Sequence, residues 1–280
     1  MSFLRSSSGK TGGLQLQDYR SSPTFYWALT GIFAALHLVM TMLPLFMLTS
    51  GEGFISIGLV TAVMIGFLLG PFYGTVSVTI GSGLGVILFN IGGILGPIVP
   101  VIAPAAGALV AGCLRTKRPQ VVLIVYGTTF FAFLIGPIGL AALSYIWLHV
   151  IAMIMVGLYI IPQTGIWLRE SMKLSESKPE NTFFSLWILC FISLLADSLV
   201  GGTTAAYYFV FALSFPIDAL AGIYNGAAFV YPLERIAVTF VITAVLLALD
   251  KALRKTPFES LLDQSQVYDS MDISHGDEAS

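Results

Sequence analysis

The chain has 280 residues, of which 56% are hydrophobic and only 10% charged, and its formal net charge at pH 7 is −2. A water-soluble globule of this size needs a much larger charged surface, so the composition excludes that class and indicates an integral membrane protein in the lipid bilayer. Strand-length segments of alternating polarity are absent, which favours a helical bundle over a barrel.

The predicted elements begin after a polar N-terminal segment, residues 1–24. The first apolar run, 25–49, is longer than the core of a signal peptide and therefore predicts a retained helix. The sequence LLGPFYG, residues 68–74, predicts a two-residue turn between the next two helices. The apolar runs after the first predict helices at 55–69, 72–89, 98–114, 121–143, 145–168, 183–200 and 232–250.

Basic residues indicate the orientation. Twelve of the 13 Lys and Arg residues lie before the first helix, after the fourth, after the sixth or after the last. The positive-inside rule places these groups and both termini in the cytoplasm, which requires an even number of crossings. The tail, 256–280, carries six acidic residues and no Lys or Arg, which is typical of a disordered, solvated segment.

Two short motifs lie near the C-terminal end of the apolar region. FPID at 215–218 and YPLE at 231–234 share one pattern, and Pro followed by an acid suits the first turn of a helix. Asn225-Gly226 is a helix-stop signal, so the first of these helices has ten residues and spans about 15 Å, half of the hydrocarbon layer. We therefore predict an all-α multi-pass bundle, residues 25–255, with about eight transmembrane helices and one short re-entrant or interfacial helix.

An ionisable side chain inside a bilayer indicates a functional site. This topology puts Asp197, Asp218, Glu234 and Arg235 near the outer side, each close to a helix end. Arg235 opposes the helix dipole and needs an acid, for which Asp218 or Asp197 is the candidate. The candidate substrate-binding residues are Asn90, Asp197, Tyr208, Asp218, Tyr224, Asn225, Glu234 and Arg235.

These residues also have ordinary explanations. Acids at helix starts, such as Asp218 and Glu234, are stabilised by free backbone N–H groups. Tyrosines are common in the aromatic belts at membrane interfaces. His37 and His149, inside apolar helices, are expected to be neutral interhelical hydrogen-bonding residues. No spacing of metal ligands, catalytic signature or Walker A pattern occurs, so we expect no enzyme activity, no metal and no cofactor.

Part of the chain resembles the substrate-binding S components of energy-coupling factor (ECF) vitamin transporters. The resemblance rests on ALTGIFAALHLV (28–39), ISIGLVTAVMIGFLLGPFYGTVSVTIGSGLG (55–85), APAAGALVAGCL (103–114) and the last helix with its basic end (231–255). It implies a subunit in the cell membrane that binds a vitamin or precursor and works with a transmembrane coupling subunit and a pair of ATPases. It also implies that small residues of the first helix, Gly31, Ala34 and Ala35, dock on the coupling subunit, although ordinary helix packing explains them equally well.

The sequence departs from that family in two respects, the additional helices within 121–200 and the acidic tail. Two alternatives therefore stay open, a self-contained secondary transporter or channel and a membrane scaffold whose tail recruits partners. Four candidate acids on the outer side, Asp197, Asp218, Glu234 and Glu52 of an outer loop, stand against one Arg and favour an amine or a cationic heteroaromatic solute. No nucleic-acid partner is expected.

Overall fold

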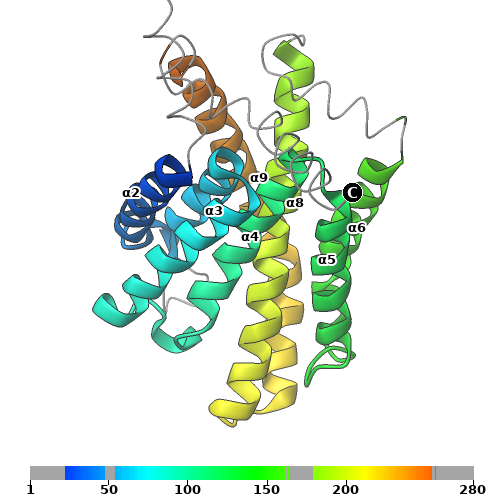
Figure 1. Ribbon diagram of the computed structural model, residues 1–280. Coiled ribbons are helices and arrows are strands. Elements are labelled where there is room, and N and C mark those ends of the chain that lie inside the picture. The colour runs from blue at the N-terminus through cyan, green and yellow to red at the C-terminus, as the bar shows by residue number, and fades with distance from the viewer. Residues whose placement is uncertain (1–22, 48–53, 162, 164–178, 254–255, 257–280) are drawn as a thin grey trace, which may run out of the picture.

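The computed structural model describes residues 23–47, 54–161, 163, 179–253 and 256 (Figure 1). The predicted polar N-terminal segment and acidic tail therefore lie outside the described residues, except for the ends that adjoin the bundle. The seven described α-helices are α2 (Pro23–Thr41), α3 (Gly58–Phe89), α4 (Val99–Arg115), α5 (Pro119–Leu134), α6 (Trp147–Ile160), α8 (Pro179–Tyr207) and α9 (Ile217–Leu253).

Shorter elements connect these helices. They are the 3-10 helices η1 (Gly93–Leu95) and η2 (Leu143–Tyr145) and the π-helix η3 (Tyr208–Ala212), which extends α8. The strands β1 (Pro44–Met47) and β2 (Phe54–Ser56) pair antiparallel, with Pro44 opposite Ser56 and Met47 opposite Phe54. The all-α class is confirmed, and this small hairpin stands where the sequence predicted the end of a helix and an outer loop.

Helix α3 is a hairpin of two helices, 58–69 and 71–89. Gly70 has φ 78° and ψ −177°, which breaks the helix and reverses the chain. His37 of α2 bonds Thr61 through Nδ1 (2.8 Å) and Ser82 through Nε2 (2.9 Å). In a straight helix those two hydroxyls would lie about 31 Å apart. The predicted turn in LLGPFYG is thus confirmed, as is the hydrogen-bonding role of His37.

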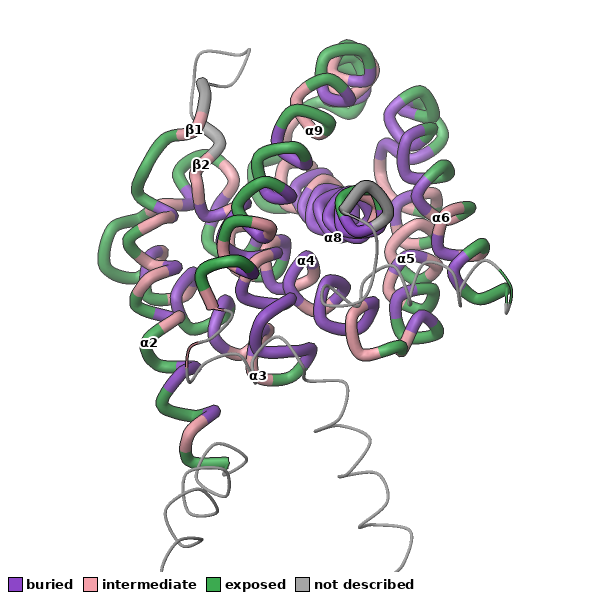
Figure 2. Tube along the Cα trace, turned by 90° about the horizontal axis from the view of Figure 1, so that it is seen from above, coloured by how far each residue is buried: buried purple, intermediate pink, exposed green. Residues whose placement is uncertain are grey.

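Helix α8 runs through the centre of the molecule. Figure 2 looks along α8 and shows it mostly buried, with α2 and α3 on one side and α5 and α6 on the other. Its apolar side chains, such as Leu189, Ile192 and Leu195, are at most 1% exposed and belong to the largest core cluster. Every residue from 189 to 199 is buried, which explains why the middle of α8 is apolar on all faces apart from Ser193, Asp197 and Ser198.

The helices alternate in direction. Tyr159 at the end of α6 donates a hydrogen bond to the carbonyl of Leu114 at the end of α4 (2.8 Å). At the other end of the bundle, Tyr207 of α8 donates to the carbonyl of Ala132 near the end of α5 (3.0 Å). With α3 counted as two, the seven described helices make eight antiparallel segments, which is the predicted number of helices.

Length and composition identify four described segments that can cross a membrane, and one of them, α3, reaches that length by adding its two halves. They support a multi-pass membrane protein. Helices α4, α5 and α6 are shorter apolar helices. Crossing by all eight segments is therefore part of the proposal below. The four segments are Pro23–Thr41, Gly58–Phe89, Thr182–Ala212 and Ile217–Leu253.

The predicted short helix does not exist. Helix α9 begins after Pro216, as predicted, but continues for 37 residues through Asn225-Gly226 and Pro232. Pro232 has no N–H for the carbonyl of Ala228, and that carbonyl accepts a hydrogen bond from Trp147 Nε1 instead (3.3 Å). Asn225 is held by Ser144 and by the carbonyl of Ala141. Contacts with the segment 141–147 thus override both local stop signals.

Candidate functional site

The charged residues Asp197 and Arg235 lie at the centres of two long apolar segments, Asp197 in the segment that α8 forms with η3 and Arg235 in α9. Asp197 is 15 residues from each end of the apolar segment Thr182–Ala212. Arg235 is 18 residues from each end of α9. The sequence had placed both near helix ends on the outer side, and that prediction is wrong because both helices are longer than predicted.

Asp197 is held between α8 and α4. Its side chain is 7% exposed, and a Cβ added at Gly107 of α4 would lie 3.1 Å from its Cβ. Any larger residue at Gly107 would therefore press on the carboxylate-bearing side chain. Asp197 also interacts electrostatically with Arg235, so of the two predicted acidic partners of Arg235 the structure selects Asp197.

Aromatic side chains surround this pair. Tyr224, Tyr231 and Arg235 lie on one face of α9, and the guanidinium of Arg235 stands 4.9 Å from the centre of the Tyr231 ring. The Tyr231 hydroxyl bonds His149 Nε2 of α6 (3.1 Å), and the two rings stack at 5.8 Å. Tyr145 packs against Tyr231, His149 and Tyr224, at ring distances of 5.6, 5.3 and 4.9 Å. His149 is thus the interhelical hydrogen-bonding residue that the sequence predicted.

Several polar atoms of the pair make no hydrogen bond to any described residue. They are Oδ2 of Asp197 and Nε and Nη1 of Arg235, all of them buried. A buried charged group without a hydrogen bond costs several kcal/mol, and most are satisfied in natural proteins. Nδ1 of His149, in the same cluster, is also buried without a hydrogen bond to a described residue. The centre of the bundle therefore presents a free carboxylate oxygen, two free guanidinium nitrogens and a free imidazole nitrogen, which a polar ligand can satisfy.

One face of α8 leads from Asp197 to the end of the helix. Ser193, Asp197, Gly201, Thr204 and Tyr208 follow one another at three- and four-residue spacing, so they lie on the same side. This side faces α4 along its length. The carbonyl of Ser193 and the side chain of Asp197 meet Gly107, Gly201 meets Ala103, and the Tyr208 ring meets Gly96.

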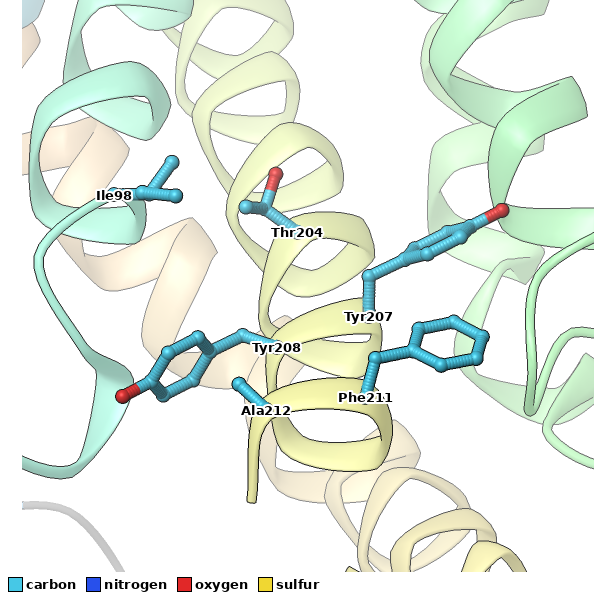
Figure 3. Close-up of a pocket in the computed structure, with 6 residues that line it drawn as sticks. All are labelled: Ile98, Thr204, Tyr207, Tyr208, Phe211 and Ala212. Carbon is cyan, nitrogen blue, oxygen red and sulfur yellow. The ribbon is translucent and has the colours of Figure 1, made fainter. Parts of the chain in front are cut away.

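A groove opens at the end of this face. Its volume is about 350 Å³, and its walls come from the start of α4 and the end of α8 with its π-helix. Figure 3 shows Tyr208 directed toward the α4 side and Tyr207 and Phe211 toward the opposite side. Thr204 lies two helical turns from Asp197, about 10 Å along α8. The lining residues are Ile98, Thr204, Tyr207, Tyr208, Phe211 and Ala212.

The structure brings some of the predicted site residues together and separates others. Asp197, Tyr224 and Arg235 belong to the central cluster, and Tyr208 lines the groove. Asn225 bonds Ser144 at the outer edge of the cluster. Asn90 and Asp218 are exposed, and Asp218 lies 17 residues from Arg235 on α9, about 25 Å away. Glu234 is half-buried, and no contact of its side chain with the cluster is seen.

The predicted docking residues also separate. Gly31 and Ala35 are exposed on α2, and nothing lies within 4 Å of a Cβ at Gly31. Ala34 is 3% exposed, and its carbonyl faces Gly81 of α3. A common docking face of all three residues is therefore wrong, because Ala34 packs inside the bundle.

The sequence did not reveal Gly107, Tyr145 and Ser198 as parts of the site. Tyr145 comes from η2, and its hydroxyl bonds the carbonyl of Ser198 (3.3 Å). Little in the sequence singles out Tyr145, because it is one of 11 tyrosines in an apolar chain. Only the packing of η2, α4 and α6 on α8 brings these residues to Asp197.

The chain was compared with protein-family models, with curated proteins and with solved structures, and no match was found in any of the three.

Proposed function

We propose that the protein is a membrane subunit that binds a small water-soluble nutrient, a vitamin or precursor, for uptake into the cell. One observation carries the proposal: Asp197 and Arg235 lie at the centres of the apolar segments Thr182–Ala212 and Ile217–Leu253 with hydrogen-bonding atoms unsatisfied. Charges at the middle of a membrane are costly and are kept where they bind a substrate or ion. Transporters commonly hold their substrate at this depth.

The groove and the α8 face suggest a route for the solute. It enters at the outer end of α8, between Ile98 and Tyr208, and moves along the α4–α8 contact to Asp197. This route requires α4 and α8 to separate, because Gly201 and Ala103 are in close contact. In this proposal all eight helical segments cross the cell membrane, with both termini in the cytoplasm.

Uptake is energised in the proposal by a coupling subunit and a pair of ATPases, with the exposed Gly31 and Ala35 on α2 as the docking face. A self-contained secondary transporter is the second candidate, favoured by the central position of Asp197, which suits binding of a coupling ion. Co-purification of ATPase subunits from native membranes supports the ATPase-coupled uptake system. Uptake that an ion gradient drives into vesicles containing this chain alone supports the secondary transporter. The scaffold alternative depends on the tail, which lies outside the described residues.

Equilibrium binding tests the proposal. The full chain in lipid nanodiscs is titrated with a panel of water-soluble vitamins and precursors, alongside Arg235→Gln and the control Lys251→Gln on the same helix. We expect one compound to bind with a Kd well below millimolar, to weaken with Arg235→Gln and to be unaffected by Lys251→Gln. If no panel member binds and no solute enters vesicles, the proposed function is wrong.

A further inference from the structure

The charges of the central cluster balance. Asp197 and Arg235 are the two acidic or basic residues found there among the described residues, and the other polar members are tyrosines, a serine and His149. A ligand with a net charge would leave an uncompensated charge at the centre of the bundle, which is strongly unfavourable. The surplus of acids read from the sequence does not apply, because Asp218 is exposed and about 25 Å along α9 from Arg235.

The free atoms of the cluster have both signs. Nε and Nη1 of Arg235 can donate to an anionic group, and Oδ2 of Asp197 can accept from a cationic one. Asp197 and Arg235 come from different helices and interact electrostatically, yet these three atoms form no hydrogen bond. A ligand that supplies only one kind of group would leave the other side of the cluster unsatisfied.

We propose that the ligand is a small zwitterion, whose carboxylate binds Arg235 and whose protonated amine binds Asp197. This inference rests on the proposed function and replaces the cationic solute that the sequence favoured. The ring of Tyr145 lies 4.9 Å from that of Tyr224 and 5.6 Å from that of Tyr231, and these three rings flank the body of the ligand. Their faces suit an apolar or aromatic body and also stabilise the amine.

A set of matched probes tests this inference. L-phenylalanine carries both charges, phenethylamine only the amine and 3-phenylpropionate only the carboxylate. Leucine, isopentylamine and 4-methylpentanoate form the same set on an aliphatic body. Binding of each probe to the full chain in nanodiscs is measured by calorimetry for the wild type, Asp197→Asn and Arg235→Gln. Asp218→Asn is the control for Asp197→Asn, because it removes an exposed carboxylate from the same protein.

The wild type should bind the zwitterion of at least one set about tenfold or more tightly than either singly charged relative, as expected for the loss of one charge-assisted hydrogen bond. The two charge-removing variants should shift the preference among the probes in opposite directions. Asp197→Asn leaves a positive site and should prefer the acid, whereas Arg235→Gln leaves a negative site and should prefer the amine. Asp218→Asn should keep the wild-type order.

Three results would overturn the inference. If the amine binds the wild type best and loses affinity with Asp197→Asn, the site binds a cation, and the proposed function survives without the zwitterion. If no probe binds while a vitamin does, the zwitterion is likewise wrong and the function stands. If neither probes nor vitamins bind, both proposals fail. A variant that does not fold is replaced by Asp197→Glu or Arg235→Lys, which keeps the charge and should keep the wild-type order with weaker binding.

Discussion

Two buried polar clusters of this bundle differ in one respect. His37, between α2 and the two halves of α3, has both ring nitrogens hydrogen-bonded, to Thr61 and Ser82. Asp197 and Arg235, between α8 and α9, leave three polar atoms without a hydrogen bond. A satisfied cluster fixes the packing of helices, while an unsatisfied one retains the capacity to bind. The first is therefore structural in our account and the second is the binding site.

The largest expected effect comes from removing the satisfied cluster. His37→Ala deletes two hydrogen bonds and leaves a cavity, so we expect the free energy of unfolding to fall by about 2–4 kcal/mol. Thermal unfolding in detergent measures this. Binding by the folded fraction should be unchanged, and Ser82→Ala, which removes one of the bonds, should cost about 0.6 kcal/mol. A loss of affinity larger than the loss of stability would show that the two clusters are not separate in function.

The next effect breaks the unsatisfied cluster. Arg235→Gln replaces the charged guanidinium donors by a neutral amide, and we expect affinity to fall about tenfold to a hundredfold, or 1.4–2.7 kcal/mol. The measurement is the titration described above, with Lys251→Gln as the matched control. If Arg235→Gln and Lys251→Gln lowered the affinity equally, Arg235 would contribute only through the overall positive charge of the protein.

A double variant tests the charge balance of this cluster. Asp197→Asn and Arg235→Gln each leave one charge alone, whereas together they leave none. We therefore expect the double variant to be more stable than the sum of the single effects by about 1–3 kcal/mol. Unfolding of all four proteins in one detergent gives the coupling energy. A coupling energy of zero would mean that the two charges are independent.

The smallest effect concerns a satisfied group near the site. Trp147→Phe removes the donor to the Ala228 carbonyl beneath Pro232, and we expect it to cost about 1 kcal/mol of stability. Pro232→Ala restores the backbone N–H, so in that background Trp147→Phe should cost less. An equal cost in both backgrounds would show that the indole stabilises the structure by packing alone.

The sequence predicted the helices better than the site. Apolar runs and the turn at Gly70 are local features, and all eight predicted helical segments have a counterpart in the structure. Helix ends were less predictable, because Asn225-Gly226 and Pro232 are overridden by Ser144, Ala141 and Trp147, which are distant in sequence. The wrong ends placed Asp197 and Arg235 at the periphery. Helix-dipole arguments predicted that Arg235 needs an acid and left Asp218 and Asp197 as candidates, but the choice of Asp197 and the central position of both residues required the packed structure.

A ligand-bound structure tests the central claim most directly. The full chain in nanodiscs is saturated with the tightest-binding vitamin or zwitterion, and its structure is determined with and without that compound. Our account predicts ligand density between α8 and α9, with contacts to Oδ2 of Asp197 and to Nε or Nη1 of Arg235. Density confined to the groove beside Tyr208, with Asp197 and Arg235 unchanged, would contradict it.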